Sequence, residues 1–544
     1  MRKTREDSRN RKADSADPLL AFNPTSTEDT QSFRQTGRPI VMDRRSFLIS
    51  MTAAATASMG ASIWAGEGPD TAPDIEVTLR DAHKGTPAID MNLLNSYGPQ
   101  PKPIQAFFAE ARAVFDADRQ ARFAGNHALE RAAGRHGLAH LGGPMLGCVG
   151  DDHAAIWVRT MKPSLVRVEV KGPGGIQRFG PVPSTVETDL TAIVPLTGLQ
   201  PARRYDYQVF VDDNRLDLGR RTTFSTFPRP KKRGVFKLAF GGDFHKSGVH
   251  NVHLMRQIVQ RGNQAMILTG DLAVDDRNNE TGLHRCDYLL RDLSPAWRSL
   301  AAAVPIYATW DDHDYFDNDL SGIPDKFTAD DVRALREIWT QNWNNPANDE
   351  AGEGIYFRTR LGPADLIMLD TRSLRKKQRK SPNAYLGDRQ MRWLKRELLN
   401  CKGPFVIISS GTMWSDYISN GKDSWGVFDT AGREELFSFI EEHKIPGVLL
   451  ICCDRHGARG FRIPRPSGYC FHELEIGTLG GMTGPGAMAK DASTQLFGRT
   501  HIKAFGEMEF DTNLADPKVT FRLVDEKGHI LERFSFLQST LTPK

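Results

Sequence analysis

The segment TWDDHDYFDND at residues 309–319 carries five aspartates and one histidine directly after the apolar run VPIYA at 304–308. Carboxylates this close repel one another unless positive charge lies among them. The apolar run has the composition of a buried strand, so the acids follow a strand end. We therefore expect a positive centre at this end of the strand.

Acids and histidines follow three further apolar runs of the same kind. GGDFH contains Asp243 and His245, TGDLAVDD contains Asp271, and CCDRHGAR contains Asp454 and His456. Carboxylates and imidazoles are the common protein ligands of metal ions. Four such clusters at strand ends, with Asp312 in the fourth, predict a metal site better than independent helix caps or surface acids do.

The elements that position these residues read as alternating strands and helices. Buried strands are expected at 236–242, 265–270, 304–310, 365–370, 404–410 and 447–453, with helical patterns between them, for instance at 388–400. Such alternation predicts an α/β layered domain whose ligands bind at the carboxyl ends of the strands. The unusual residues fall at those ends.

Upstream of this domain the pattern changes to short strands between turn residues, over residues 144–228. The segment LTGLQPARRYDYQVFV resembles the corner of a fibronectin type III-like sandwich, and FPRPKKRG at 227–234 reads as a linker. Residues 67–143 contain one helical stretch, roughly 103–135, which we interpret as packing without chemistry.

The N-terminal part reads as an export signal. MDRRSFLIS at 42–50 is typical of a twin-arginine signal, with Arg44 and Arg45 before a weakly apolar stretch and small residues for cleavage near 61–65. Polar interruptions and its short length disfavour a membrane anchor. Residues 1–41 are polar and without periodicity, so we expect a disordered extension and Met42 as the true start.

The order of the strand-end motifs resembles that of the calcineurin-like metallophosphoesterases, which read DxH, GD, GNH and GHxH. The PhoD-type alkaline phosphatase branch is more similar, because DDH stands there for GNH and a GDxH-like motif for GHxH. LDTRS at 369–373 and YLGDRQMRWLKREL at 385–398 extend the resemblance. It covers about residues 144–535 and implies a layered αββα metallophosphoesterase domain over 234–535, behind the fibronectin type III-like β-sandwich.

The resemblance implies hydrolysis of a phosphate ester by two metal ions about 3.5 to 4 Å apart, which supply hydroxide and cancel phosphoryl charge. Asp271 would bridge the two ions. Site A would hold Asp243, His245, Asp271 and His456, a set suited to iron, manganese or zinc. Site B would hold Asp271, Asp312 and Asp454, and its oxygens favour calcium, magnesium or manganese.

The family pattern makes His313 a non-ligand that donates a proton to the leaving oxygen, with Asp311 or Asp314 orienting its other ring nitrogen. Arg372 and Arg455 are candidates for binding a phosphoryl oxygen, and ion-paired arginines are the alternative. His250 is expected on a helix surface. The glycine-rich GTLGGMTGPG at 477–486 is expected to flank the pocket rather than to cradle a nucleotide.

Three departures from the PhoD-type pattern limit what is carried over. The usual Ser-Cys pair after the first strand is replaced by Asp243 and His245, so iron is not implied. Val274 stands where that branch has a tyrosine, so a coloured iron-tyrosinate is not expected. The run ISSGTMWSD lacks the superfamily's histidine, which leaves Thr412, Ser410 or a water to complete site B.

These features predict an exported phosphoesterase, periplasmic or secreted, that acts on mono- or diesters and engages the twin-arginine export machinery. A phospholipase or teichoic-acid-type phosphodiesterase, and a metal-retaining cell-surface binding protein, are the alternatives. The presence of Asp271 and His313 favours catalysis over the binding protein. The net charge of +4 gives no electrostatic case for a nucleic-acid partner.

Overall fold

The computed structural model describes residues 77–347, 353–418 and 423–544, all within the compact unit formed by residues 71–544. The expected extension at 1–41 and the expected signal at 42–66 lie outside these residues. No helix in the described ranges combines the length and the apolar composition that crossing a bilayer requires.

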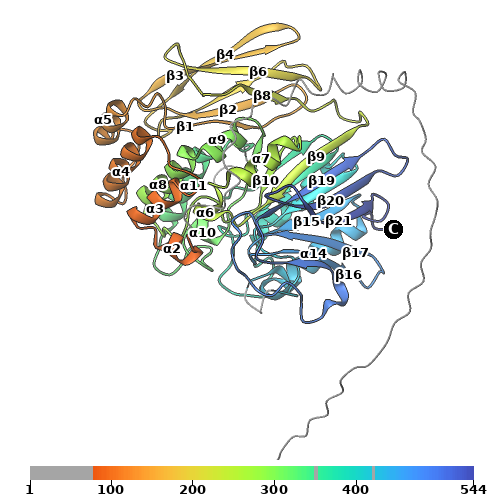
Figure 1. Cartoon of the computed structure of the whole chain (residues 1–544). Helices are drawn as coiled ribbons and strands as arrows, with labels where there is room; N and C mark the ends of the chain where they lie inside the picture. Colours follow the sequence, from red (N-terminus) through yellow and green to blue (C-terminus); the bar gives the residue numbers. More distant parts are fainter. Residues whose placement is uncertain (1–76, 348–352, 419–422) are drawn as a thin grey trace, which may run out of the picture. The chain divides into compact units, whose positions relative to one another are not determined.

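Two mixed β-sheets form the centre of the described structure (Figure 1). The first has the order β11-β10-β9-β19-β20-β21 and the second the order β12-β13-β14-β15-β17-β16-β18. Their bounds are β9 Val235–Gly241, β10 Met266–Leu268, β11 Ile306–Ala308, β12 Phe357–Leu361, β13 Ala364–Met368, β14 Phe405–Ser409, β15 Val448–Cys452, β16 Ala458–Pro464, β17 Cys470–Ile476, β18 Gln495–Arg499, β19 Ala504–Asp511, β20 Lys518–Asp525 and β21 Ile530–Leu537.

The sheets pack face to face because their strands are apolar on both sides. Along β14, Ile407 belongs to the buried cluster that also contains Phe240 of the first sheet, whereas Ile408 belongs to a cluster with the outer helices. Successive strand residues point to opposite faces, so a strand buried on both faces reads as a continuous apolar run. The predicted strands were recognisable for this reason.

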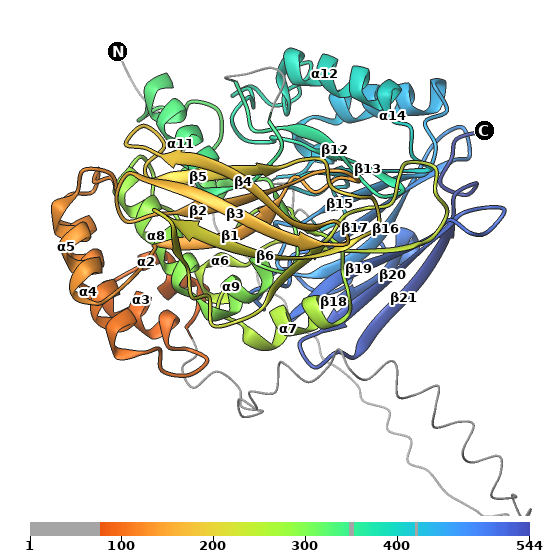
Figure 2. The same cartoon turned by 90° about the horizontal axis from the view of Figure 1, so that it is seen from above.

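Helices cover the outer face of each sheet. Leu254 and Trp297 of α7 and α9 pack on the first sheet, and Leu394 and Phe437 of α12 and α14 pack on the second. Figure 2 shows α12 and α14 together along one side of the molecule. The bounds are α6 His245–Gly248, α7 Val252–Gln260, α8 Thr281–Leu293, α9 Pro295–Ala301, α10 Asp312–Tyr315, α11 Ala329–Asn342, α12 Gly387–Asn400, α13 Trp425–Phe428, α14 Thr430–Glu442 and η1 Ala492–Thr494. The predicted α/β layering is confirmed.

Upstream of the layered domain the chain forms two antiparallel sheets, β1-β2-β5 and β4-β3-β6-β7, with β8 paired to β6. Ile156 of one sheet and Val168 of the other lie in the same buried cluster. A fibronectin type III-like identity for this pair of sheets stays a prediction. The bounds are β1 Gly142–Gly147, β2 Ala154–Arg159, β3 Ser164–Gly172, β4 Gly175–Ser184, β5 Thr191–Leu196, β6 Arg204–Val211, β7 Asn214–Arg215 and β8 Thr222–Ser225.

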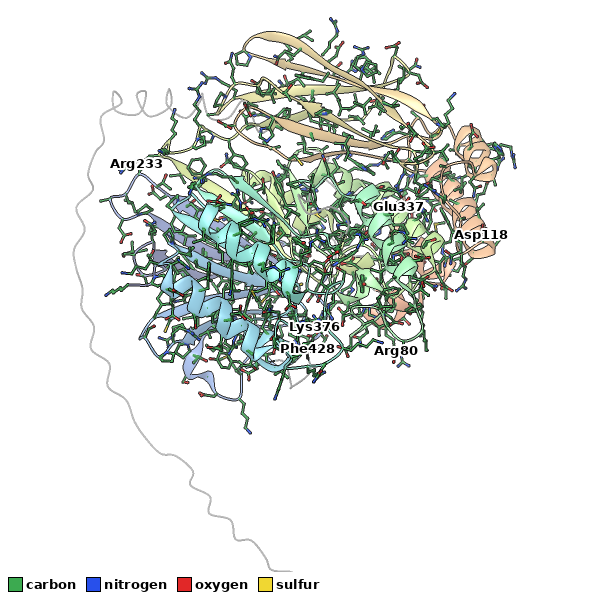
Figure 3. All side chains as sticks on the ribbon, turned by 180° about the vertical axis from the view of Figure 1, so that it is seen from behind. Arg80, Asp118, Arg233, Glu337, Lys376 and Phe428 are labelled. Carbon is green, nitrogen blue, oxygen red and sulfur yellow. The ribbon has the colours of Figure 1, made fainter. Side chains whose placement is uncertain are left out.

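The helical stretch expected at 103–135 is two helices rather than one. α4 (Lys102–Ala117) ends before an exposed loop that contains Asp118 (Figure 3), and α5 (His127–Arg135) begins after Asn126. The Asn126 side chain accepts a hydrogen bond from the Leu129 amide and so caps the second helix. Two shorter helices precede them, α2 (Leu79–Lys84) and α3 (Pro87–Leu94).

A buried network of charges joins these N-terminal helices to the layered domain. Asp90 of α3 accepts from Arg112 Nε of α4 at 2.8 Å and from Lys246 Nζ of α6 at 2.9 Å. Lys246 Nζ also lies 3.4 Å from Asp287 of α8, which pairs with Arg277 at 2.7 Å. All five side chains are buried, so each charge depends on its partners.

Asp90→Ala is expected to lower the free energy of unfolding by about 3–5 kcal/mol, because it leaves the buried cations Lys246 and Arg112 without their shared carboxylate. Chemical denaturation of the full chain measures the change. Arg333→Ala, which removes an exposed ion pair with Asp330, is the control and should cost less than about 1 kcal/mol. Equal effects of the two substitutions would show that the network does not hold the N-terminal helices in place.

Candidate active site

The predicted ligands lie in tight turns directly after the strands. Asp243 follows β9, Asp271 follows β10 and Asp454 follows β15, with φ angles of +54°, +53° and +82°. β9, β10 and β11 run parallel, so their carboxyl ends meet at one edge of the sheet. Residues other than glycine adopt positive φ at a cost, and such positions cluster at functional sites. The chain thus strains its backbone to place these three carboxylates.

Several ligand atoms at this edge are buried and find no hydrogen-bond partner among the described residues. They are Asp271 Oδ1, Asp312 Oδ1, Asp454 Oδ2, His245 Nε2 and His456 Nδ1. Buried polar atoms in proteins are normally hydrogen-bonded, and an exception indicates a bound group or ion. Ligand atoms of Asp271, Asp312 and His313 lie within 4.8 Å of one another, as do those of Asp311, Asp312 and Asp454. The arrangement fits metal ions.

The electrostatics of the carboxylates agree with that fit. Burial and the neighbouring charges of Asp312, Asp311 and Asp243 raise the pKa of Asp271 well above its usual range. The pKa of Asp454 is also raised well above its usual range, by burial and by the charges of Asp311 and Asp312. Without cations, these two carboxyl groups would take up protons rather than stay charged side by side. Bound cations would reverse that preference.

Asp243, His245 and His456 form the nitrogen-containing part of the site. Asp243 accepts from the amides of Asp454 and His456, both at 3.1 Å, and lies 3.4 Å from His456 Nδ1. Burial opposes its charge, but His456 and His245 outweigh burial and lower the pKa of Asp243 to about 2. His245 Nδ1 is 2.8 Å from Asp275 Oδ1, which leaves Nε2 as the ring atom available to a metal.

His313 is oriented by Asp276, and the expectation of Asp311 or Asp314 in that role is wrong. His313 Nδ1 lies 2.6 Å from Asp276 Oδ1. Asp314 instead accepts from the Leu272 amide at 3.0 Å, and burial raises its pKa to about 8. Asp275 and Asp276 are the last two residues of the TGDLAVDD motif, so the sequence contained the signal that would have identified both.

The two arginines differ in their surroundings. Arg372 is fully buried and engages carboxylates on several sides: it donates to Asp311 through Nη2 at 2.8 Å and lies 2.9 Å from Asp423 and 3.5 Å from Asp312. Arg455 is 16% exposed, and its nearest ion-pair contact is Asp454 at 3.8 Å. Arg455 is therefore the freer of the two to meet an anion.

The residues left open for the second metal position have other partners. The Ser410 hydroxyl accepts from Trp425 Nε1 at 3.1 Å, and the Thr412 hydroxyl donates to the Tyr385 hydroxyl at 2.7 Å. Asp311, in contrast, shares a group of closely spaced ligand atoms with Asp312 and Asp454. Both oxygens of Asp311 also accept from Arg372, so this carboxylate has another partner as well.

The 477–486 loop packs directly on the ligands. A Cβ at Gly477 would lie 2.1 Å from Asp243 Oδ2, and one at Gly484 would lie 2.8 Å from His456 Cβ. Only glycines fit this close approach, so the loop flanks the site as expected. His250 differs from its prediction: it is buried rather than on a helix surface.

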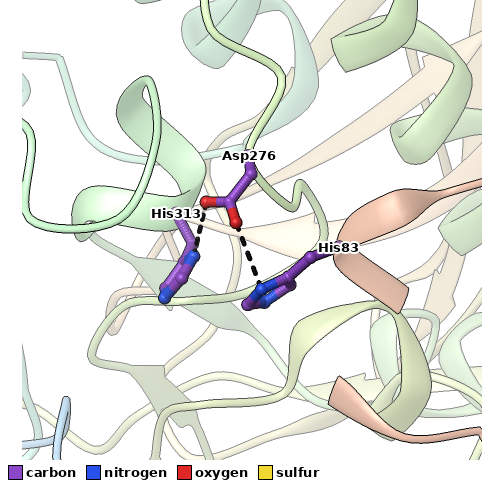
Figure 4. A group of neighbouring side chains, drawn as sticks. All are labelled: His83, Asp276 and His313. Carbon is purple, nitrogen blue, oxygen red and sulfur yellow. Dashed lines mark hydrogen bonds and ion pairs between the residues drawn. The ribbon is translucent and has the colours of Figure 1, made fainter. Parts of the chain in front are cut away.

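Sequence reasoning missed His83, which α2 of the N-terminal segment carries into the site (Figure 4). Its Nδ1 lies 3.1 Å from Asp276 Oδ2, and its ring centroid is 4.5 Å from that of His313. Burial is the main cause that lowers the pKa of His83 to about 4. His83 lies outside the stretch 103–135 that we interpret as packing, and a lone histidine far upstream of the motifs gave no signal.

Comparison with known proteins agrees with this geometry. Residues 257–521 match the model of the PhoD-like phosphatases, and residues 139–228 match a domain of unknown function (DUF7800). No curated protein matches the chain.

Two solved structures share the fold. A structure of PhoD is 16% identical, with a TM-score of 0.59 over 72% of this chain and 89% of that one. Purple acid phosphatase PPD1 from yellow lupin (Lupinus luteus) seeds is 13% identical, with a TM-score of 0.52 over 72% of this chain and 73% of that one. The recognition made from the motifs is confirmed: residues 257–521 match the PhoD-like phosphatase family, and the chain is a metallophosphatase.

Proposed function

We propose that the chain hydrolyses phosphate mono- or diesters at a site that holds two metal ions. The observation that supports this most strongly is the set of buried ligand atoms without hydrogen-bond partners on Asp271, Asp312, Asp454, His245 and His456. Two cations would leave none of these ligand atoms without a partner, with Asp271 shared between the histidine-containing set and the set of oxygen ligands.

The residues divide into two ligand sets. One ion would be held by Asp243, His245, Asp271 and His456, a mixture of nitrogen and oxygen donors suited to iron, manganese or zinc. The other would be held by Asp271, Asp312 and Asp454, with Asp311 beside them, and these oxygens favour calcium, magnesium or manganese.

Bound there, the two ions supply an activated water and neutralise charge on the phosphoryl group. The chain's own residues do the remaining work. Asp276 holds the Nδ1 side of His313, which leaves Nε2 to donate a proton to the leaving oxygen. Arg455, at the partly exposed rim, binds a phosphoryl oxygen. Arg372 holds Asp311 in place rather than meeting substrate.

We also propose that the chain is exported through the twin-arginine route to the periplasm or the cell surroundings. The motif MDRRSFLIS at 42–50 supports this assignment. In the same proposal, residues 234–535 act as the catalytic domain and residues 144–228 as a fibronectin type III-like module. β21 ends at Leu537 and Leu541 is buried, which supports including these residues in the proposed catalytic unit.

Turnover of small esters tests the proposed activity and its substrate class. The full chain, reconstituted in parallel with manganese, zinc, or iron plus calcium, is expected to hydrolyse a nitrophenyl phosphate monoester or the matching diester, because neither reaction needs more than the two ions and a proton donor. The ratio of the two rates identifies the preferred ester. Bound metal without turnover of either ester would contradict the proposal and favour a binding protein.

Asp271→Asn and His313→Ala are both expected to lower turnover, but for different reasons. The first should abolish turnover and lower the metal content, because it removes the charge that two cations share. The second should lower kcat by roughly 10²- to 10⁴-fold with both ions retained, because it removes only a proton donor. Metal analysis of each purified variant, beside Asp330→Asn as an exposed control, makes the distinction. Loss of metal from His313→Ala would make His313 a ligand instead.

A further inference from the structure

We propose that His83 is a positioning residue for the reaction: it fixes the Asp276 carboxylate and, through it, the orientation of His313. The role rests on the proposed function of His313 as the proton donor. It makes the N-terminal segment, which lies outside the part of the chain matched to the phosphatase family, a component of the active site.

Two adjacent aspartates hold His245 and His313, and His83 lies against both aspartates. Asp275 Oδ1 is 2.8 Å from His245 Nδ1, and Asp276 Oδ1 is 2.6 Å from His313 Nδ1. His83 Nδ1 lies 3.1 Å from the second oxygen of Asp276, and its Nε2 lies 3.9 Å from Asp275 Oδ1. Figure 4 shows the His83 and His313 rings on the two oxygens of one carboxylate.

Asp276 needs this additional support because of its position. It lies in a turn with φ of +55°, and its Oδ1 serves both His313 and the Asn318 amide at 3.1 Å. The other oxygen, Oδ2, lies 3.1 Å from His83 Nδ1. Without His83 the Asp276 carboxylate can rotate. The His313 imidazole, which Asp276 orients, then loses its fixed direction.

His83 lies on α2, whose C-terminal end is anchored to the layered domain. α2 ends at Gly85, whose φ is +52° and whose missing Cβ would lie 2.0 Å from the Arg277 guanidinium. The Gly85 carbonyl accepts from Arg112 Nη2 at 2.6 Å, which ties it to the buried network around Asp90. His83 stands two residues before this anchored glycine, so its ring has little freedom to move from Asp276.

A third metal position is the alternative reading of the same cluster. Ligand atoms of His83, His245 and Asp275 lie within 4.8 Å of one another, as do those of His83, Asp276 and His313. In the group that contains Asp275, His245 Nδ1 pairs with the carboxylate at 2.8 Å, whereas His83 Nε2 lies 3.9 Å from it and has no hydrogen-bond partner among the described residues. In the group that contains Asp276, however, the two carboxylate oxygens already pair with His313 Nδ1 at 2.6 Å and His83 Nδ1 at 3.1 Å. Atoms engaged in those contacts are not free to bind an ion, so the geometry favours positioning.

The test compares leaving groups. In the metal-loaded full chain, His83→Leu is expected to lower kcat by about 10- to 100-fold on phenyl phosphate, the usual size of an effect on an orienting residue, and clearly less on nitrophenyl phosphate. Phenolate is a poorer leaving group than nitrophenolate, so hydrolysis of phenyl phosphate depends more strongly on the proton donor. His83→Asn, whose amide N–H can still donate to Asp276, should recover most of the loss. Lys84→Ala, exposed on the same helix, should behave as wild type.

Three results would overturn the proposal. They are an equal loss on both esters, no recovery in His83→Asn, and one metal ion fewer in His83→Leu, which would make His83 a ligand. His313→Ala is measured in parallel to separate the two proposals. If the loss of kcat in His313→Ala depends on the leaving group and the loss in His83→Leu does not, only the role proposed for His83 is wrong. If His313→Ala shows no such dependence, the role of His313 itself is wrong.

Discussion

Mutual repulsion among buried carboxylates is the constraint on which this structure depends. Asp243, Asp271, Asp311 and Asp312 are buried at one edge of the layered domain, and the Asp454 side chain there is only 9% exposed, so water screens these charges poorly. Arg372 pairs with Asp311, whose pKa burial nevertheless raises to about 7, and the histidines compensate Asp243. Asp271 and Asp454 keep raised pKa values, so the protein chain alone does not balance them. A cation-binding centre follows from that imbalance.

The residues around the carboxylates fix the orientation of the histidines in the centre. His245 and His313 are each held by an aspartate of the Asp275–Asp276 pair, and His83 lies against both of those acids. Lys246, the residue after His245, is buried in the Asp90 network. The N-terminal helices are thereby coupled to the turn that presents the first metal ligands. The same buried contacts therefore orient the proposed metal ligands and attach the N-terminal segment.

The strand ends could be predicted because two local signals coincide there: an apolar run buried on both faces, followed at once by acids and histidines. That coincidence located Asp243, Asp271, Asp312 and Asp454 without a structure. Local signals do not report which distant groups meet. The attachment of His83 to Asp276 spans nearly two hundred residues of chain, and the choice of Asp276 over Asp311 or Asp314 depends on how the turn after β10 folds against α10. The division between α4 and α5 was missed because an apolar pattern continues on either side of the Asn126 cap.

Anomalous diffraction from crystals of the metal-loaded protein tests the central claim most directly. Data collected above and below the absorption edge of manganese or zinc would locate each ion without assuming its ligands. The account predicts two peaks on opposite sides of the Asp271 carboxylate, separated by about 3.5 to 4 Å, one near His245 and His456 and the other near Asp312 and Asp454. A single peak, or peaks away from Asp271, would contradict it.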